Sequence, residues 1–170
     1  MNYLSHYSSP LGSITITSDG RTVTGLWFGG QRHFPTLSES EYSKADLPIF
    51  QQTHRWLDHY FRGGKDEALP PLNPHLTPFQ QIVSDILLTI PYGHTTTYSN
   101  IAQLAATRMG RGHLSAQAVG SAVGYNPISI LIPCHRVIGA NGSITGYAGG
   151  IDRKRWLLNL ENPQLFQTTL

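Results

Sequence analysis

The segment 68–78 constrains this chain most, because it contains four prolines among eleven residues. Proline fixes its own φ angle and has no backbone N–H, so neither a helix nor a central strand continues through such a segment. We therefore predict a linker here. It separates an N-terminal domain over residues 1–74 from a C-terminal domain over residues 75–170.

The N-terminal part has the sequence pattern of a β-hairpin. Residues 13–17 alternate polar and apolar side chains, and β-branched and aromatic residues resume over 22–28 after an Asp-Gly turn signal. Residues 29–48 are polar and contain Gly, Ser and Pro, which favours a loop. Apolar side chains at helical spacing predict a helix over 49–61.

Helices are expected to dominate the C-terminal part. Residues 78–90 place their apolar side chains on one face of a helix that begins with proline. A short helix is expected over 100–106, with Ser99 as its N-cap. Another follows over 116–123, with Ser115 as its N-cap. Two short helices joined by a Gly-containing turn are typical of a helix-turn-helix.

Two interpretations fit the small residues of the helix expected over 116–123. Its Ala and Gly side chains favour close packing against the preceding helix, and they are also compatible with entry into a DNA groove. Beyond it, residues 128–132 are expected to form a buried strand and 133–150 a glycine-rich loop. A final helix is predicted over 152–160.

Charge differs between the two parts of the chain. Residues 1–78 carry six Lys or Arg and seven Asp or Glu, whereas residues 79–170 carry six and three. A basic part beside a nearly neutral one fits a domain that faces nucleic acid, since phosphate groups are neutralised by Lys and Arg. An excess of three charges is mild support for such a partner.

Cys134 is the only cysteine in the chain, so no intramolecular disulfide can form. No run approaches the roughly 20 apolar residues that span a bilayer. The first twenty residues lack the basic stretch and apolar core of a signal peptide. These patterns predict a cytoplasmic protein that does not interact with membranes.

The cysteine itself has two possible roles. It stands in the sequence Pro-Cys-His-Arg, residues 133–136, directly after the apolar segment. Neighbouring His and Arg side chains favour the thiolate, which is the nucleophilic form of cysteine. A lone cysteine is also often an inert buried residue, so these residues alone leave both roles open.

A series of further motifs surrounds this cysteine, and their order and spacing point to one family. These motifs are Phe79-Gln80-Gln81, Ile90-Pro91-Tyr92-Gly93, Thr97-Tyr98, Ala118-Val119-Gly120, Asn126-Pro127-Ile128, Pro133-Cys134-His135-Arg136-Val137-Ile138-Gly139, Gly142, Thr145-Gly146-Tyr147-Ala148-Gly149-Gly150 and Trp156-Leu157-Leu158 with Glu161. Residues 79–161 thereby resemble the methylated-DNA–protein-cysteine methyltransferases. The N-terminal part resembles them more weakly, through Ser9-Pro10-Leu11-Gly12 and Tyr60-Phe61-Arg62-Gly63.

The resemblance implies an α+β fold, with a ribonuclease-H-like α/β N-terminal domain and a mostly helical C-terminal domain that contains a helix-turn-helix. It implies direct-reversal DNA repair in which the Cys134 sulfur takes the alkyl group from O6-alkylguanine in double-stranded DNA. O4-methylthymine would react less readily. The thioether forms irreversibly, so each molecule would act once, as a monomer and without a cofactor.

The resemblance also implies roles for residues around Cys134. Glu161 and His135 would remove the thiol proton through a bound water, because a thiol with a pKa near ~8.5 is mostly protonated at neutral pH. Tyr98 would donate its hydroxyl to the guanine as the leaving oxygen gains charge. Asn126 would form side-chain hydrogen bonds that connect the loop containing Cys134 to the helix expected over 116–123, which would read the DNA. The alternatives are a core tyrosine at 98 and an ordinary turn asparagine at 126.

Another set of residues is expected on the substrate and DNA side of the site. It consists of Pro133, Arg136, Val137, Tyr147, Ala148 and Gln117. The loop 147–150 would form a wall over a base swung out of the duplex, since the duplex hides the O6 atom. Arg136 would brace the active-site loop structurally, and Ala148 stands where many relatives have Ser.

Position 117 departs from the family's pattern. Relatives usually have Arg there, which fills the gap left by the flipped base, whereas this chain has Gln117. Arg108 and Arg111 are expected to contact phosphates nearby. Some relatives also bind a structural zinc through Cys and His in the N-terminal domain, and no metal site is expected here because that domain has no cysteine.

Two functions of other kinds fit this sequence less well than repair. An alkyltransferase-like damage sensor binds alkylated DNA but lacks the reactive cysteine, which this chain has. A Cys–His hydrolase takes its base from a distant part of the sequence, whereas His135 directly follows Cys134.

Overall fold

The computed structural model describes residues 1–65 and 67–165 and divides the chain into two compact units. The first unit contains residues 1–75 together with 127–131, and the second contains 76–126 and the chain from 132 onward. In the described part of the chain, the helices are all too short or too polar to cross a membrane.

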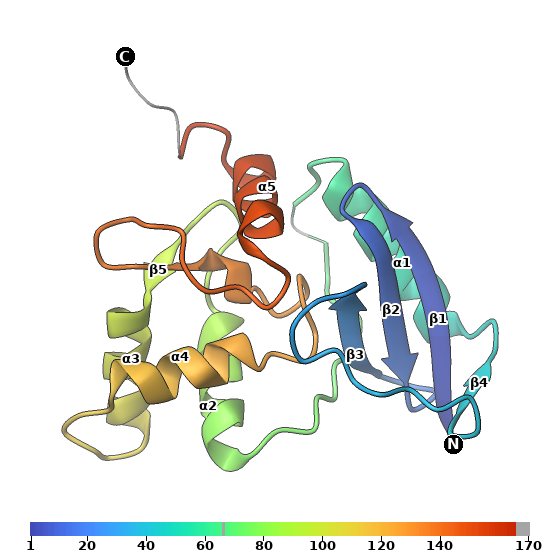
Figure 1. The fold of residues 1–170 in the computed structure, drawn as a ribbon, viewed down its shortest axis with the longest axis horizontal. Coiled ribbons are helices and arrows are strands. Elements are labelled where there is room, and N and C mark those ends of the chain that lie inside the picture. Colours follow the sequence, from blue (N-terminus) through green and yellow to red (C-terminus); the bar gives the residue numbers. More distant parts are fainter. Residues whose placement is uncertain (66, 166–170) are drawn as a thin grey trace. The chain divides into compact units, whose positions relative to one another are not determined.

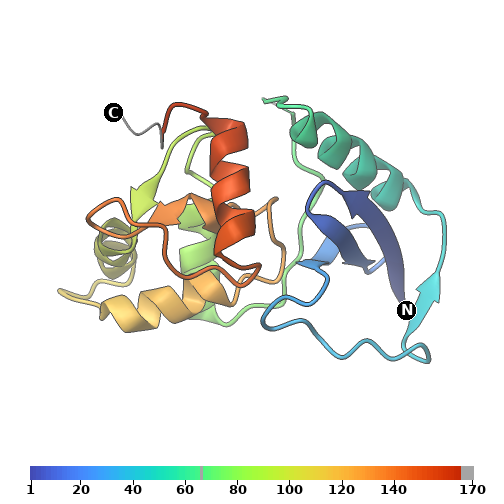
Figure 2. The same cartoon turned by 45° about the horizontal axis from the view of Figure 1, so that its top comes forward.

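A four-stranded sheet with one helix packed against it forms the first unit (Figures 1 and 2). The strand order is β3-β2-β1-β4; β2 pairs antiparallel with β1 and β3, and β4 pairs parallel with β1. The elements are β1 (Asn2–Ser9), β2 (Gly12–Ser18), β3 (Val23–Phe28), β4 (Tyr42–Lys44) and α1 (Pro48–Phe61). Ile14 and Ile16 of β2 and Leu26 of β3 are fully buried.

The predicted hairpin is confirmed as β2 and β3, and the predicted helix as α1. The sequence did not predict β1 or β4. β1 is largely polar and only partly buried, so its conformation is set by pairing with β2 rather than by its own pattern. β4 is three residues long and lies within the segment expected to be a loop.

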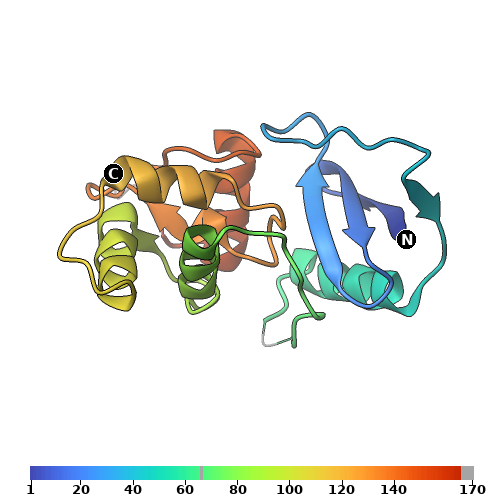
Figure 3. The same ribbon diagram turned by 90° about the horizontal axis from the view of Figure 1, so that it is seen from below.

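In its described residues, 76–126 and 132–165, the second unit is built from four helices, a short 3-10 turn and two short strands. Figure 3 shows α2, α3 and α4 grouped together, and these three helices pack against one another. Strands β5 and β6 pair in parallel. The elements are α2 (Pro78–Leu87), β5 (Thr96–Thr97), α3 (Tyr98–Arg108), α4 (Ala116–Gly124), the 3-10 turn η1 (Cys134–Arg136), β6 (Val137–Ile138) and α5 (Ile151–Glu161).

One helix start was predicted wrongly. α3 begins after Thr97, whose hydroxyl accepts a hydrogen bond from the N–H of Asn100 at 3.1 Å, and not after Ser99. Pairing of β5 with β6 holds Thr97 in the extended conformation that an N-cap requires. The cap at Ser115 is confirmed, since its hydroxyl accepts from the N–H of Ala118.

The strand predicted over 128–132 does not form. Only Ile128 makes a bridge, to Leu26 of β3, and the following residues turn. Ile130 has φ +70°, a region that β-branched residues rarely adopt, and the N–H of Leu131 bonds to the carbonyl of Ser129 at 2.8 Å. All five residues are buried. The apolar pattern therefore predicted the burial of this segment correctly, but it predicted the wrong backbone conformation.

Candidate active site

Cys134 lies at the start of η1 and is 5% exposed. The side-chain amide of Asn126 donates to its sulfur at 3.1 Å and to the carbonyl of Ile132 at 2.8 Å. Burial raises the pKa of the Cys134 thiol, and the Asn126 hydrogen bond and the Lys154 charge offset this only in part. A thiol in this setting is protonated at neutral pH, so it needs a base in order to become a nucleophile.

His135, the residue that follows Cys134 in η1, forms a buried pair with Glu161. The Nε2 atom of His135 lies 2.5 Å from Oε2 of Glu161, and both side chains are almost completely buried. Burial lowers the pKa of His135 more than the attraction of Glu161 raises it, which keeps the ring neutral. A carboxylate only accepts hydrogen bonds, so Nε2 carries the ring hydrogen and Nδ1 has a lone pair.

The Nδ1 atom of His135 is the part of this pair that is suited to proton transfer. It is buried and has no hydrogen-bond partner among residues 1–65 and 67–165. A neutral imidazole nitrogen in this state can accept a proton, and the carboxylate on the other ring nitrogen stabilises the resulting cation. The arrangement therefore has the chemistry of a general base.

Glu161 is held in the charged form by three donors. Besides His135, it accepts from Nε of Arg136 at 2.7 Å and from the N–H of Gly93 at 3.1 Å. Burial alone would raise the pKa of this carboxyl group, but the interactions with His135 and Arg136 outweigh burial and hold the pKa well below its usual range. Glu161 is consequently an anion throughout the neutral pH range.

The turn around Gly93 fixes the end of α5, where Glu161 lies. Gly93 has φ +79°, and a Cβ added to it would lie 3.2 Å from the Glu161 carbonyl oxygen. The side-chain amide of Asn162 donates to the Gly93 carbonyl at 3.2 Å, and Nη1 of Arg136 donates to the Ile90 carbonyl at 2.7 Å. Arg136 therefore braces this turn and Glu161 together.

Tyr98 is the first residue of α3 and faces the glycine-rich loop. Its hydroxyl lies 3.0 Å from the carbonyl oxygen of Thr145 and 3.1 Å from that of Gly146, and it can donate to one of them at a time. Burial, with a further contribution from Cys134, raises the pKa of Tyr98 to about 12. The hydroxyl thus stays protonated and remains a hydrogen-bond donor.

Lys154 is a buried residue of this region that the sequence analysis missed. It is fully buried, its ammonium donates to the carbonyls of Val137 and Thr145, and it lies 5.8 Å from the centre of the Tyr98 ring. Burial lowers its pKa to about 8, against the raising effect of Cys134. The signal was helical spacing, because Lys154 lies seven residues before Glu161, on the same buried face of α5.

The remaining predicted residues differ in how far their side chains are exposed. Pro133, Val137 and Tyr147 are buried near the cysteine turn or in the loop, and Ala148 is partly exposed. Gln117 lies in the first turn of α4 and is exposed. Among the described residues, no cluster of three or more His, Cys, Asp or Glu side chains is suited to holding a metal ion.

Two protein-family models match this chain and together span most of it. The ribonuclease-like domain of 6-O-methylguanine DNA methyltransferase matches residues 2–74, and the DNA-binding domain of the same enzyme matches residues 78–163. The first match covers the sheet unit, and the second covers the segment from α2 to α5.

Individual relatives match over nearly the whole length of the chain. A methylated-DNA–protein-cysteine methyltransferase of Haemophilus influenzae is 38% identical over 160 residues, which cover 94% of this chain and 86% of the relative. The enzyme of that name from Mycobacterium tuberculosis is 43% identical over 160 residues, covering 92% of each chain.

Solved structures give the same result. The M. tuberculosis O6-methylguanine methyltransferase superposes with a TM-score of 0.81 at 41% identity, covering 96% of this chain and 94% of the other. A crystal structure of M. tuberculosis OGT in complex with DNA superposes with a TM-score of 0.80 at 40% identity, covering 97% and 99%.

Proposed function

This chain belongs to the 6-O-methylguanine DNA methyltransferase family, and on that premise we propose that Cys134 is the residue through which it acts. It is a methylated-DNA–protein-cysteine methyltransferase, which repairs DNA by moving the methyl group of O6-methylguanine onto a cysteine. Its fold is α+β, with a ribonuclease-like sheet domain and a helical DNA-binding domain. Since the chain has one cysteine, Cys134 is the acceptor.

The observation that carries this assignment is the buried pair that Glu161 forms with His135, the residue after Cys134. The thiol proton of Cys134 passes through a water molecule to Nδ1 of His135, and Glu161 stabilises the imidazolium that forms. The sulfur then attacks the methyl carbon, the bond from that carbon to O6 breaks, and its electron pair stays on the guanine. The guanine anion then takes up one proton at N1, which balances the proton given up by the thiol, so the products are a thioether on Cys134 and an unmodified guanine.

Tyr98 and the loop 147–150 support the departure of guanine. As the base enters the site, the Tyr98 hydroxyl leaves the loop carbonyls and donates to the guanine ring, where it stabilises the developing negative charge. Backbone N–H groups of the loop face O6, so Ala148 replaces Ser with little loss. Asn126 keeps the sulfur of Cys134 directed toward the substrate.

The proposal also covers which alkyl groups and bases react and where the protein acts. Larger O6-alkyl groups are transferred in the same way, and O4-methylthymine is transferred less readily. The thioether on Cys134 is not cleaved at neutral pH in water, so each molecule acts once. We propose that the protein acts as a monomer in the cytoplasm, where a reactive thiol stays reduced.

Intact-mass spectrometry after incubation with an O6-methylguanine duplex tests the assignment. The expected result is a single added methyl group per molecule, mapped to Cys134, with no further reaction when more duplex is added. Unmodified protein bound to DNA would indicate a damage sensor, and unmodified protein with repaired DNA and released methanol would indicate a hydrolase. A parallel incubation with an O4-methylthymine duplex measures the proposed second substrate.

A further inference from the structure

The wall segment, residues 145–150, includes the loop 147–150, which faces O6 in the proposed function. Three of its six residues are glycines, and Gly146 and Gly150 have φ angles of +59° and +93°. Glycine has no Cβ, so it adopts such conformations readily and restrains the backbone least. Contacts with side chains from other elements therefore have a large share in fixing where this backbone lies.

Two adjacent residues of α5 supply such contacts, one near each end of the wall segment. At its start, the ammonium of Lys154 donates to the carbonyl of Thr145 at 2.8 Å. Near its end, Nη1 of Arg153 donates to the carbonyl of Gly149 at 3.2 Å. The middle of the wall segment therefore lies between two points of attachment to the same helix.

The two attachments differ in their burial. Lys154 is fully buried and also donates to the carbonyl of Val137. Arg153 is only partly buried, so water can replace its hydrogen bond to Gly149 at a smaller cost in free energy. The Gly149 end is therefore the more easily released of the two, and a substitution of Arg153 loosens that end while the Thr145 end stays attached.

We propose that Arg153 is a positioning residue that limits the size of the O6-alkyl group, because it holds the Gly149 end of the wall segment in place. This inference rests on the proposed function, in which the loop 147–150 lies over the base and Cys134 attacks the alkyl carbon. The sulfur, that carbon and O6 lie in line while the new bond forms and the old one breaks, so any substituent on the carbon projects sideways. A methyl group has only hydrogens there, whereas a benzyl group has a phenyl ring that needs room beside the wall segment.

Release of the Gly149 end should affect the transfer of the two groups differently. The backbone donors that face O6 are placed less precisely, so transfer of a methyl group becomes slower. The phenyl ring gains room at the same time, so transfer of a benzyl group slows less or becomes faster. The ratio of the benzyl rate to the methyl rate should rise ~3- to 10-fold, since the fit of one methylene in a pocket is worth ~10- to 200-fold and a shifted loop is a smaller change.

Two duplexes of the same sequence test this expectation, one with O6-methylguanine and one with O6-benzylguanine at the same position. Single-turnover rates are measured at saturating duplex, so any loss of a DNA contact cancels in the ratio. Arg153→Met keeps a straight side chain but removes the guanidinium. Arg155→Met is the matched control, because Arg155 is exposed and its guanidinium lies 3.8 Å from Asp152 on the same helix. The ratio should rise in Arg153→Met alone, and an unchanged ratio there or an equal rise in the control overturns the proposal.

Amide hydrogen exchange of Gly150 measures whether Arg153 acts through the wall segment. The N–H of Gly150 bonds to the carbonyl of Tyr147 at 2.9 Å, so it is protected while this turn is held. Arg153→Met is expected to speed this exchange at least ~3-fold, and Arg155→Met is expected to leave it unchanged. Wild-type exchange in Arg153→Met would overturn the proposal even if the ratio of rates changed.

The wild-type rates separate a failure of this inference from a failure of the proposed function. If the wild type transfers both groups and Arg153→Met has the same ratio, the inference about Arg153 fails and the proposed function stands. If the wild type transfers neither group, the proposed function fails and the inference fails with it. A general loss of stability lowers both rates together, so it does not produce the expected change in their ratio.

Discussion

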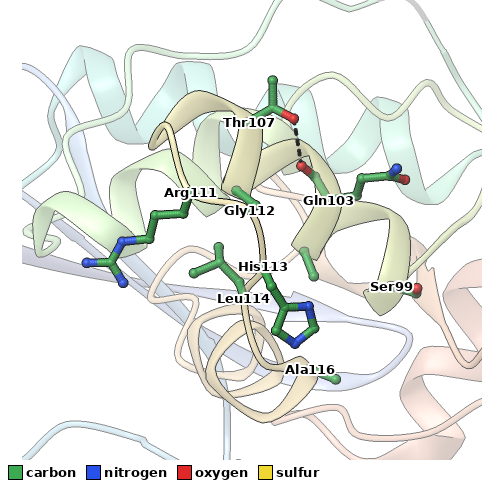
Figure 4. A pocket seen from close by; sticks show the side chains of 10 residues that line it. Ser99, Gln103, Thr107, Arg111, Gly112, His113, Leu114 and Ala116 are labelled. Carbon is green, nitrogen blue, oxygen red and sulfur yellow. Dashed lines mark hydrogen bonds between the residues drawn. The ribbon is translucent and has the colours of Figure 1, made fainter.

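The cysteine site and the helix-turn-helix surface differ in how their polar side chains are held. Around Cys134 the charged groups are buried and paired: Glu161 accepts from three donors, and Lys154 donates to two carbonyls. On the helix-turn-helix, the side chains of Arg111 (Figure 4) and Gln117 are exposed. The first region is organised by contacts within the chain, whereas the second presents exposed side chains.

This difference predicts that substitutions in the two regions change the reaction in different ways. Changes in the cysteine site should slow transfer from a duplex and from a free base alike, since both substrates meet the same groups. Changes on the helix-turn-helix should affect the duplex alone. The predictions below are ordered from the largest expected effect to the smallest.

Cys134→Ser should abolish alkyl transfer, because a hydroxyl is a far weaker nucleophile than a thiol at neutral pH. Binding to an O6-methylguanine duplex should persist, since the helix-turn-helix is unchanged. Intact-mass spectrometry and a DNA-binding titration measure the two properties. Any alkylated mutant protein would refute the assignment of the acceptor.

Tyr98→Phe should lower the single-turnover rate ~10- to 1000-fold, because one donor to developing charge is removed. Duplex affinity should change little, and the free base should show the same loss of rate. The mutant also loses the hydrogen bond to the loop carbonyls, so its melting temperature must be measured as a control. A wild-type rate would make Tyr98 an ordinary packing residue.

Lys154→Met should reduce the free energy of unfolding by about 1–3 kcal/mol, because the carbonyls of Val137 and Thr145 lose a buried donor. Transfer should slow on both substrates as the loop loosens. Arg155→Met, on the exposed side of the same helix, is the matched control and should change stability by less than about 0.5 kcal/mol. Equal effects of the two substitutions would contradict the claim that the buried hydrogen bonds of Lys154 stabilise the fold.

Lys154 also predicts a pH dependence of stability. Its pKa is about 8 in the folded protein and is ordinarily 10.5, so between these values the unfolded chain binds more protons. The contribution of this residue to the free energy of unfolding should therefore rise with pH across that window. Denaturant titrations of wild type and Lys154→Met at pH 7.5 and pH 10 measure it, and an identical pH response of both proteins would contradict the shift.

Gln117→Ala should weaken duplex repair roughly 2- to 10-fold through the loss of one hydrogen-bonding side chain. Its reaction with free O6-benzylguanine should be unchanged. Gln117→Arg should match or exceed the wild type on duplex, because Arg adds a planar cation that stacks on bases. Both measurements need one fixed salt concentration. Equal losses of Gln117→Ala on duplex and free base would assign the residue to the fold instead.

The sequence predicted the buried chemistry better than the fold around it. Resemblance to a family pointed to Cys134, His135 and Glu161 together because their motif spacing is fixed along the chain. The burial of Lys154 was not predicted, because lysine is normally a surface residue. Only its position on the buried face of α5 distinguishes it from other lysines and arginines.

The errors in the fold have local physical causes. The segment 128–132 was expected to be a strand because short apolar runs look alike whether extended or turned. The left-handed conformation of Ile130 depends on its surroundings, which no pattern in the sequence encodes. The cap of α3 lies at Thr97 because β5 pairs with β6, and the paired residues Thr97 and Ile138 are 41 positions apart in the sequence.

The central claim is that Glu161 and His135 supply the base for a thiol that burial keeps protonated. Glu161→Gln keeps the size and an acceptor oxygen but removes the charge that stabilises the imidazolium. Single-turnover transfer to this variant should be at least ~10-fold slower than wild type at pH 7. At pH 9 the deficit should shrink, because the thiol begins to ionise without help. The same deficit at pH 7 and pH 9 would contradict the account and leave Glu161 a structural residue.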